Sequence, residues 1–166
     1  MLRLFSTVLM ASLLAACGSQ PRYAEPKQGH VERYNPPNET RQNPPRNGRL
    51  LDYALEQQGI RYRYGGNSPG SGFDCSGLIQ FSYAQVGKRI PRTTQQQFRS
   101  SMPISIGRIR PGDLLFYETE GRRPGHVAMY LGQGEMIHAP SSGKQVKISR
   151  LNNPYWRSRL IAAGRF

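Results

Sequence analysis

The residues best suited to covalent chemistry in this chain are one cysteine and two histidines in its second half. Cys75 lies in the stretch GFDCSGLIQF, directly before an apolar run, and His126 and His138 follow in two strand-like segments. A thiol at a helix start lies near unpaired N–H groups and the positive end of the helix dipole, which favour a thiolate below its ordinary pKa. A cysteine, a base and an orienting group form the set used by thiol acyl-transfer enzymes. We therefore interpret Cys75 as a nucleophile, His126 as its base and His138 as the orienting group.

Other roles for these three residues stay open at this point. Cys75 is also compatible with an inert buried position, and both histidines are compatible with ordinary polar positions at strand ends. A zinc site made of the three side chains is a further alternative, although close ligand spacing such as C-x-x-C is absent. We expect neither a metal nor an organic cofactor.

Three helices and five strands must position these residues. Apolar periodicity predicts helices over 49–60, with Gly59 as the stop, over 75–87, and over 91–98, with Thr93 or Thr94 as the cap. The period then changes to that of strands, over 113–118, 126–132, 135–140, 145–151 and 160–166, with a flexible loop expected at 118–125. If the second and third strands pair, His126 and His138 lie side by side. This order predicts an α+β fold with an antiparallel sheet packed against the helices.

The first residues have the features of an export signal. Residues 1–16 combine a positive start with an apolar run that is shorter than the roughly 20 residues needed to span a bilayer. LAAC, residues 14–17, resembles the bacterial lipobox, which implies a lipid such as palmitate on Cys17 and a stable membrane anchor. Gly18 in place of aspartate favours, by the same resemblance, the outer membrane and a protein facing the periplasm.

The segment between Cys17 and the globular part has the composition of a disordered linker. Residues 18–48 contain six prolines and scarcely any aliphatic side chains, so we predict a tether over 17–48 and a folded domain over 49–166. A lipidated Cys17 leaves Cys75 without a partner; a Cys17–Cys75 disulfide is the alternative. The net charge of +13 in an exported protein favours anionic envelope polymers and lipid head groups over nucleic acid.

A set of longer motifs resembles a known family. The stretches YRYGG, FDCSGLIQF, PRTTQQQ, RPGDLLFY, GHVAMYLGQGEMIHAP and WRSRLIAAGRF follow one another between residues 62 and 166. Together they resemble the NlpC-type cell-wall peptidases, a papain-like cysteine peptidase family, over nearly the whole of 49–166. The resemblance implies N-terminal helices packed on a central antiparallel sheet of about five to six strands. It assigns the nucleophile to Cys75, the base to His126 and the third polar residue to His138.

The same resemblance implies a substrate and a reaction. It places Tyr64 near the oxyanion, and Asp74 and Ser76 beside a peptide subsite. The expected function is a cysteine endopeptidase that hydrolyses a stem-peptide amide of peptidoglycan, such as the γ-D-glutamyl-diamino acid bond, through a thioester acyl-enzyme. We expect a monomer without bound nucleic acid. The alternatives are a non-catalytic envelope lipoprotein that binds or scaffolds peptidoglycan, and a related thiol amidase or transacylase.

Overall fold

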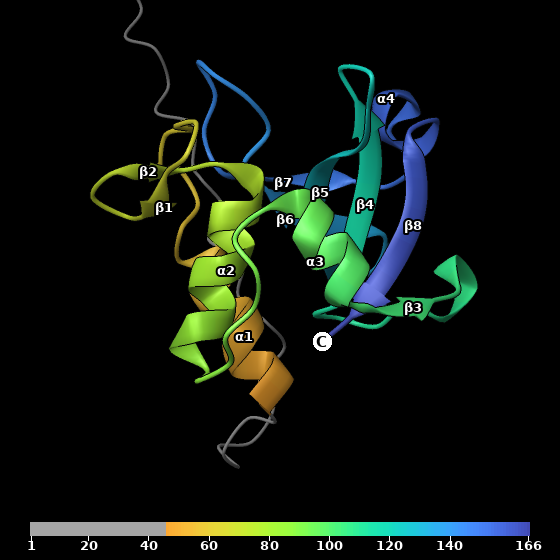
Figure 1. The fold of residues 1–166 in the computed structure, drawn as a ribbon, viewed down its shortest axis with the longest axis horizontal. Coiled ribbons are helices and arrows are strands. Elements are labelled where there is room, and N and C mark those ends of the chain that lie inside the picture. Colours follow the sequence, from red (N-terminus) through yellow and green to blue (C-terminus); the bar gives the residue numbers. More distant parts are fainter. Residues whose placement is uncertain (1–45) are drawn as a thin grey trace, which may run out of the picture. The chain divides into compact units, whose positions relative to one another are not determined.

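A computed structural model describes residues 46–166 (Figure 1). Its elements are, in chain order, α1 (Arg46–Leu55), β1 (Asn67–Ser68), β2 (Gly72–Phe73), α2 (Cys75–Gln85), α3 (Thr94–Ser100), β3 (Met102–Ile104), a 3₁₀ turn (Ile106–Arg108), β4 (Leu114–Thr119), β5 (Arg122–Gly132), β6 (Glu135–His138), β7 (Lys147–Arg150), α4 (Pro154–Arg157) and β8 (Leu160–Arg165). The predicted signal peptide, the lipid site at Cys17 and the tether up to residue 45 lie outside the described residues. None of the described helices is long and apolar enough to cross a membrane.

Six strands form one antiparallel sheet in the order β3-β8-β4-β5-β6-β7. The short β1–β2 hairpin is a separate two-stranded sheet beside α2 (Figure 1). The strands β5 and β6 pair in the register Met129↔Ile137, through a turn that contains Gly132 and Gly134. The predicted α+β class and the antiparallel sheet of five to six strands are therefore confirmed.

The helices cover the sheet where β5 runs. Both α2 and α3 pack against β5, and α1 packs against α2 (Figure 1). The apolar side of α2 provides Leu78 and Ile79, which are fully buried in one cluster with Phe116, Val127 and Met129 of the sheet. Burying side chains of this size is worth about 1.5–3 kcal/mol each, which holds the start of α2 firmly against β5.

The first helix differs from its prediction at both ends. It begins at Arg46, three residues inside the predicted tether, and ends at Leu55 rather than near Gly59. The residues of a first helical turn supply carbonyl acceptors to the next turn, so the helical backbone can begin before the apolar period from which the helix was predicted. Beyond Leu55 the backbone continues in tighter turns, with Gln58 N–H donating to the Leu55 carbonyl, until Gly59 reverses the chain at φ +84°.

The segment expected as a flexible loop before His126 is a tight hairpin. Thr119 pairs with Arg122 across a two-residue turn at Glu120 and Gly121, both with positive φ. Two central residues with positive φ match the twist of the flanking strands, so the strands continue up to the turn. As a result β5 starts at Arg122, and His126 is held four residues inside the strand, opposite Tyr117, rather than at its beginning.

Several short elements were not predicted, among them β3 and α4. β3 pairs with β8 at one edge of the sheet, and its central Pro103 is tolerated because an edge strand needs fewer N–H donors. α4 starts with Pro154 behind the cap Asn153, whose side chain accepts from Tyr155 N–H. Elements of three and four residues are too short for hydrophobic periodicity to reveal them.

Candidate active site

The start of α2 is built by a cap and by two glycines. The Asp74 side chain caps the helix by accepting from Gly77 N–H at 2.7 Å, so Cys75 is the first helical residue. A Cβ on Gly77 would collide with the Gly66 carbonyl oxygen, which shows how closely the two backbones approach. The glycines around Cys75 therefore serve close packing between the helix start and the 64–66 turn, and they fix the position of the thiol.

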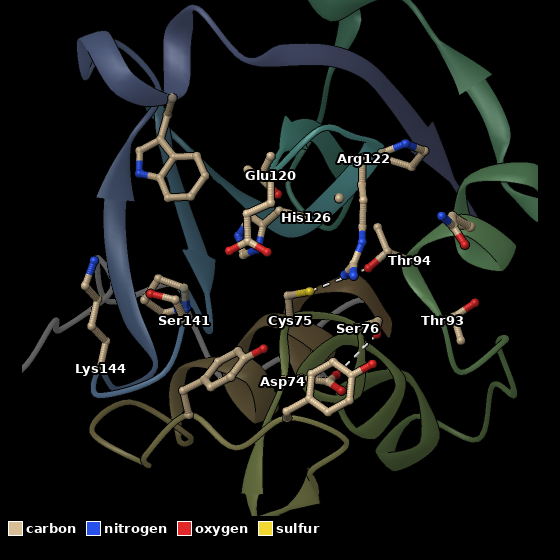
Figure 2. Close-up of a pocket in the computed structure, with 18 of the residues that line it drawn as sticks. Asp74, Cys75, Ser76, Thr93, Thr94, Glu120, Arg122, His126, Ser141 and Lys144 are labelled. Atoms are coloured by element: carbon tan, nitrogen blue, oxygen red, sulfur yellow. Dashed lines mark hydrogen bonds between the residues drawn. The ribbon is translucent and has the colours of Figure 1, made fainter.

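Cys75 borders an open cavity of about 840 Å³ (Figure 2). Its Sγ lies 3.5 Å from Thr94 Oγ1, at the start of α3. The cap of α3 is Thr93, which forms a reciprocal capping box with Gln96, and this leaves the buried Thr94 hydroxyl to face the sulfur. The predicted cap at Thr93 or Thr94 is thus resolved, and the second threonine contacts the candidate nucleophile.

The pKa of the Cys75 thiol differs from the sequence prediction. Burial raises this pKa above its ordinary value, and the hydrogen bonds from Thr94 and from the Val127 backbone lower it by less. The nearby charge of Asp74 raises it further. The prediction of a lowered pKa from the helix start alone is therefore wrong for the free site, where Cys75 rests as a neutral thiol.

The two histidines lie together on neighbouring strands, as predicted. His126 Nε2 lies 3.0 Å from His138 Nδ1, with both rings buried and nearly perpendicular at 79°. Of the two rings, His126 lines the cavity together with Cys75, and His138 lies behind it. Because Nε2 of His126 is engaged by His138, its Nδ1 is the nitrogen left for the thiol.

Burial keeps both histidines neutral at neutral pH. It lowers the pKa of His126 to about 3. Burial also lowers the pKa of His138 to about 2, with smaller effects in the same direction from His126, Lys147 and Lys144. A neutral imidazole next to a neutral thiol is the arrangement of a general base before it takes a proton.

The single tryptophan of the chain covers the histidine pair. Trp156, in α4, stacks on His126 with ring centroids 5.0 Å apart at 27°, and meets His138 edge-on at 4.8 Å and 89°. This apolar ring shields the hydrogen bond between the histidines from water, which strengthens it. From the sequence, Trp156 stood out only as part of the closing motif WRSRLIAAGRF. Its contact with the histidines depends on α4, which is too short to predict.

The two tyrosines of the YRYGG stretch have different surroundings. Tyr64, the residue predicted to lie near the oxyanion, lines the cavity but is 82% exposed. Tyr62 also lines the cavity, packs partly buried against the core, and has its pKa raised first by burial and then by Cys75. The partly buried tyrosine on the cavity with Cys75 is thus Tyr62, which was not predicted from the sequence. A hydrogen bond from Gly66 N–H to the Arg63 carbonyl closes a turn that directs Tyr64 outward.

Asp74 and Ser76 line the cavity, and both are engaged by Arg92. The Arg92 guanidinium donates to Asp74 Oδ1 at 2.9 Å and Oδ2 at 2.6 Å, and to Ser76 Oγ at 3.0 Å. Asp74 also accepts from Gly65 N–H at 2.9 Å. This network ties the helix start to the 64–66 turn and to the segment before α3. The predicted substrate-binding role of Asp74 and Ser76 stays a prediction, and Arg92 was not anticipated.

The cavity rim carries cations from different elements. Arg122 on β5 lies beside Thr94, and Lys144 lies across the cavity from it (Figure 2). Lys147 of β7 also lines the cavity. None of these three cations pairs with a carboxylate in residues 49–166. Across the described part of the chain, no three His, Cys, Asp or Glu side chains gather closely enough to hold a metal ion.

Taken together, these contacts provide the groups needed for acyl transfer by a thiol. Cys75 and His126 line one cavity, and the N–H of Cys75 has no acceptor within its own helix because it is the first helical residue. Such an N–H, aimed at the site of attack, is a donor for an oxyanion. The geometry therefore brings together candidates for a nucleophile, a base, an orienting group and an oxyanion donor.

Comparisons with known proteins agree with this reading. Residues 59–165 match the model of the NlpC/P60 family. Murein DD-endopeptidase MepH of Escherichia coli K12 is 40% identical over 119 residues, covering 69% of this chain and 44% of MepH. Bifunctional muramidase/DL-endopeptidase CwlT of Bacillus subtilis 168 is also 40% identical, over 118 residues, covering 70% of this chain and 35% of CwlT. This chain thus spans less than half the length of both relatives.

Solved structures show the same similarity. The NlpC/P60 domain of the peptidoglycan hydrolase SagA superposes with a TM-score of 0.62 at 35% identity, over 72% of this chain and 98% of that domain. An NlpC/P60 family protein from Bacillus cereus ATCC 10987 gives a TM-score of 0.69 at 34% identity, over 74% of this chain and 40% of that protein. From its sequence match, its fold and its site, this chain belongs to the NlpC/P60 family.

Proposed function

We propose that this protein is a cysteine endopeptidase that hydrolyses a stem-peptide amide of peptidoglycan. The observation that carries the proposal is the pairing of Cys75 and His126 on one open cavity, with His138 hydrogen-bonded behind His126. Relatives named as murein endopeptidases support the substrate class. A purely binding or scaffolding lipoprotein would not require a thiol and a neutral base held together in this way.

The mechanism follows from the protonation states of the resting site. Nδ1 of neutral His126 accepts the thiol proton as the Cys75 sulfur attacks the amide carbonyl, and the developing oxyanion is stabilised by the Cys75 N–H and the Tyr62 hydroxyl. The imidazolium then gives its proton to the leaving amine, and a thioester remains. In the second half, His126 takes a proton from water, the hydroxide attacks the thioester, and the acid product leaves with the thiol restored.

The rim cations support an anionic peptide as substrate. Stem peptides carry free carboxylates near their amides, and Arg122, Lys144 and Lys147 present positive charge around the cavity that no carboxylate in residues 49–166 pairs with. These charges do not identify the bond that is cleaved, and the two relatives at 40% identity are named for different bonds, one DD and one DL. We propose the γ-D-glutamyl-diamino acid amide as the bond, with the DD cross-link as the competing substrate.

Digestion of defined muropeptides tests this proposal. The purified protein is incubated separately with an uncross-linked tetrapeptide muropeptide and with a DD-cross-linked dimer, and the products are identified by mass spectrometry. Release of a fragment that begins with the diamino acid supports the proposed bond, whereas conversion of dimer to monomers assigns the DD bond instead. No cleavage of either substrate, with the protein folded, would overturn the hydrolase proposal.

The two tyrosines provide a matched test of the oxyanion site. We expect Tyr62→Phe to lower kcat about 10- to 100-fold, because it removes one hydroxyl donor from the position where charge develops. Tyr64→Phe should change kcat by less than about twofold, because Tyr64 is 82% exposed. Steady-state kinetics of both variants on the same muropeptide decides between the residues; a larger loss in Tyr64→Phe would restore the sequence prediction.

We further propose that Cys17 carries a lipid that anchors the protein in the outer membrane, facing the periplasm. The support is the lipobox-like LAAC after an apolar run and the proline-rich segment that follows. Cys17→Ala should move the protein out of the membrane fraction or leave it unprocessed, while muropeptide hydrolysis stays within about twofold, since an anchor contributes local concentration and no reacting group. A normally processed, membrane-bound Cys17→Ala protein would contradict the anchor.

A further inference from the structure

Behind the candidate base, a chain of hydrogen bonds continues away from the cavity. His126 Nε2 lies 3.0 Å from His138 Nδ1, and His138 Nε2 lies 2.9 Å from Ser149 Oγ. His138 is fully buried, and neither it nor Ser149 lines the cavity. Ser149 comes from β7, where its neighbour two residues earlier, Lys147, pairs with His138 across the strands. The third member of the site thus has a partner of its own.

Only two arrangements of protons satisfy both hydrogen bonds while both rings are neutral. In the first, His126 carries its proton on Nε2 and donates to His138, whose own Nε2–H donates to the Ser149 oxygen. In the second, His138 donates from Nδ1 to His126, and the Ser149 hydroxyl donates to His138 Nε2. The first arrangement leaves His126 Nδ1 with a free lone pair toward Cys75, whereas the second places a proton there and blocks it as a base.

The first arrangement is also the one that the reaction requires. When His126 takes the thiol proton, both its ring nitrogens carry protons, and its Nε2–H needs an acceptor at His138 Nδ1. His138 can accept there only if its proton is on Nε2, and that buried N–H then needs an acceptor in turn. The Ser149 oxygen is the acceptor that the structure provides at that atom.

We propose that Ser149 is a positioning residue: by accepting from His138 Nε2–H it holds the histidine pair in the tautomer that leaves His126 able to deprotonate Cys75. This inference rests on the proposed function, because it concerns the base of the same reaction. No sequence signal pointed to Ser149, since its role arises only from the pairing of β6 with β7.

The charges around His138 explain why a neutral hydroxyl is a suitable partner. The groups that act on it are His126 on β5, Lys147 on β7 and Lys144 in the loop before β7, all of which disfavour a positive charge. Trp156 covers its remaining side with an apolar ring. His138 therefore stays neutral while His126 cycles through its charged form, and it needs a partner that accepts a hydrogen bond without drawing a proton.

The test compares two substitutions of Ser149 whose side chains have nearly the same shape. Threonine and valine are nearly isosteric, and both suit a strand, but only threonine keeps the hydroxyl at position 149. In the full-length protein, Ser149→Thr should retain kcat within about threefold, whereas Ser149→Val should lower kcat about 10- to 100-fold, the range for one hydrogen bond that supports a charged group. KM should change little in either variant, because Ser149 does not line the cavity.

The second measurement reports the tautomer directly. Nitrogen-15 NMR of the histidine rings distinguishes Nε2–H from Nδ1–H imidazoles, and it needs no substrate. We expect Nε2–H signals for His126 and His138 in the wild type and in Ser149→Thr, and a gain of Nδ1–H signal in Ser149→Val. Equal kcat in the two variants, or unchanged tautomers in Ser149→Val, would overturn the positioning role. Inactivity of the wild type on every muropeptide would instead remove the proposed function, and the NMR result would still decide the role of Ser149.

Discussion

Replacing Cys75 by serine is expected to abolish muropeptide hydrolysis, with a loss on the order of 10⁴-fold or more. A hydroxyl at this position is a far weaker nucleophile than a thiol, and a base arranged for sulfur does not activate it sufficiently. The fold should survive, because Cys75 is only partly buried and the cap on Gly77 N–H comes from Asp74 rather than from Cys75. The measurement is turnover of a muropeptide, with circular dichroism and thermal unfolding as the control. Turnover within tenfold of the wild type would remove Cys75 as the nucleophile.

The same residue provides a test of the resting protonation state. Because burial raises the pKa of the Cys75 thiol, alkylation by iodoacetamide should be slow near pH 6 and should accelerate only above the ordinary thiol pKa. Helix-start activation alone predicts the reverse, with rapid alkylation near pH 6. The alkylation rate as a function of pH separates the two models, and a plateau reached by pH 6 would show a stable thiolate.

The fold was largely predictable because its main signals are local. Each of the five predicted strands appears in the sheet, since each carries an apolar run bounded by turn residues. The helix predicted over 75–87 was predictable for the same reason; it ends at Gln85, two residues before Gly87. The β4–β5 hairpin was missed because its turn, Glu120–Gly121, lies in a charged segment of the kind that is also typical of flexible loops.

The candidate site was predictable only in part. Cys75, His126 and His138 were found because a lone thiol and two histidines stand out by residue type. The residues that contact them did not stand out in the sequence, because serine, tyrosine and arginine are common on any surface. Tyr62, Ser149 and Arg92 gain their roles from contacts across 11 to 26 residues of sequence, which only the folded chain establishes. The direction of the thiol pKa was missed for the same reason, since burial depends on packing.

Removal of the base should be nearly as damaging as removal of the nucleophile. His126→Ala should lower kcat by about 10⁴-fold, because no other imidazole among the described residues lines the cavity. His138→Gln should lose only about 10- to 100-fold, since the glutamine amide oxygen can still accept from His126 Nε2–H, as a hydrogen bond of this kind requires. Steady-state kinetics of both variants, each checked by thermal unfolding, measures the difference. A folded His138→Gln that is as inactive as His126→Ala would show that the division of roles is wrong.

The pH dependence of hydrolysis by the wild type follows from the burial of His126. His126 acts as a base only when it is neutral, and burial lowers its pKa to about 3, so kcat/KM should not fall as the pH drops through 6.5. The free energy of unfolding, by contrast, does change as the pH falls below 6.5. An unfolded histidine binds a proton near pH 6.5 and the folded one does not, so the folded state loses stability as the pH falls from 6.5 toward 3. Initial rates must therefore be compared only where circular dichroism shows the native fold. A decline in kcat/KM centred near pH 6.5 with the fold intact would mean that His126 is solvated in the free enzyme, and that Trp156 does not shield it there.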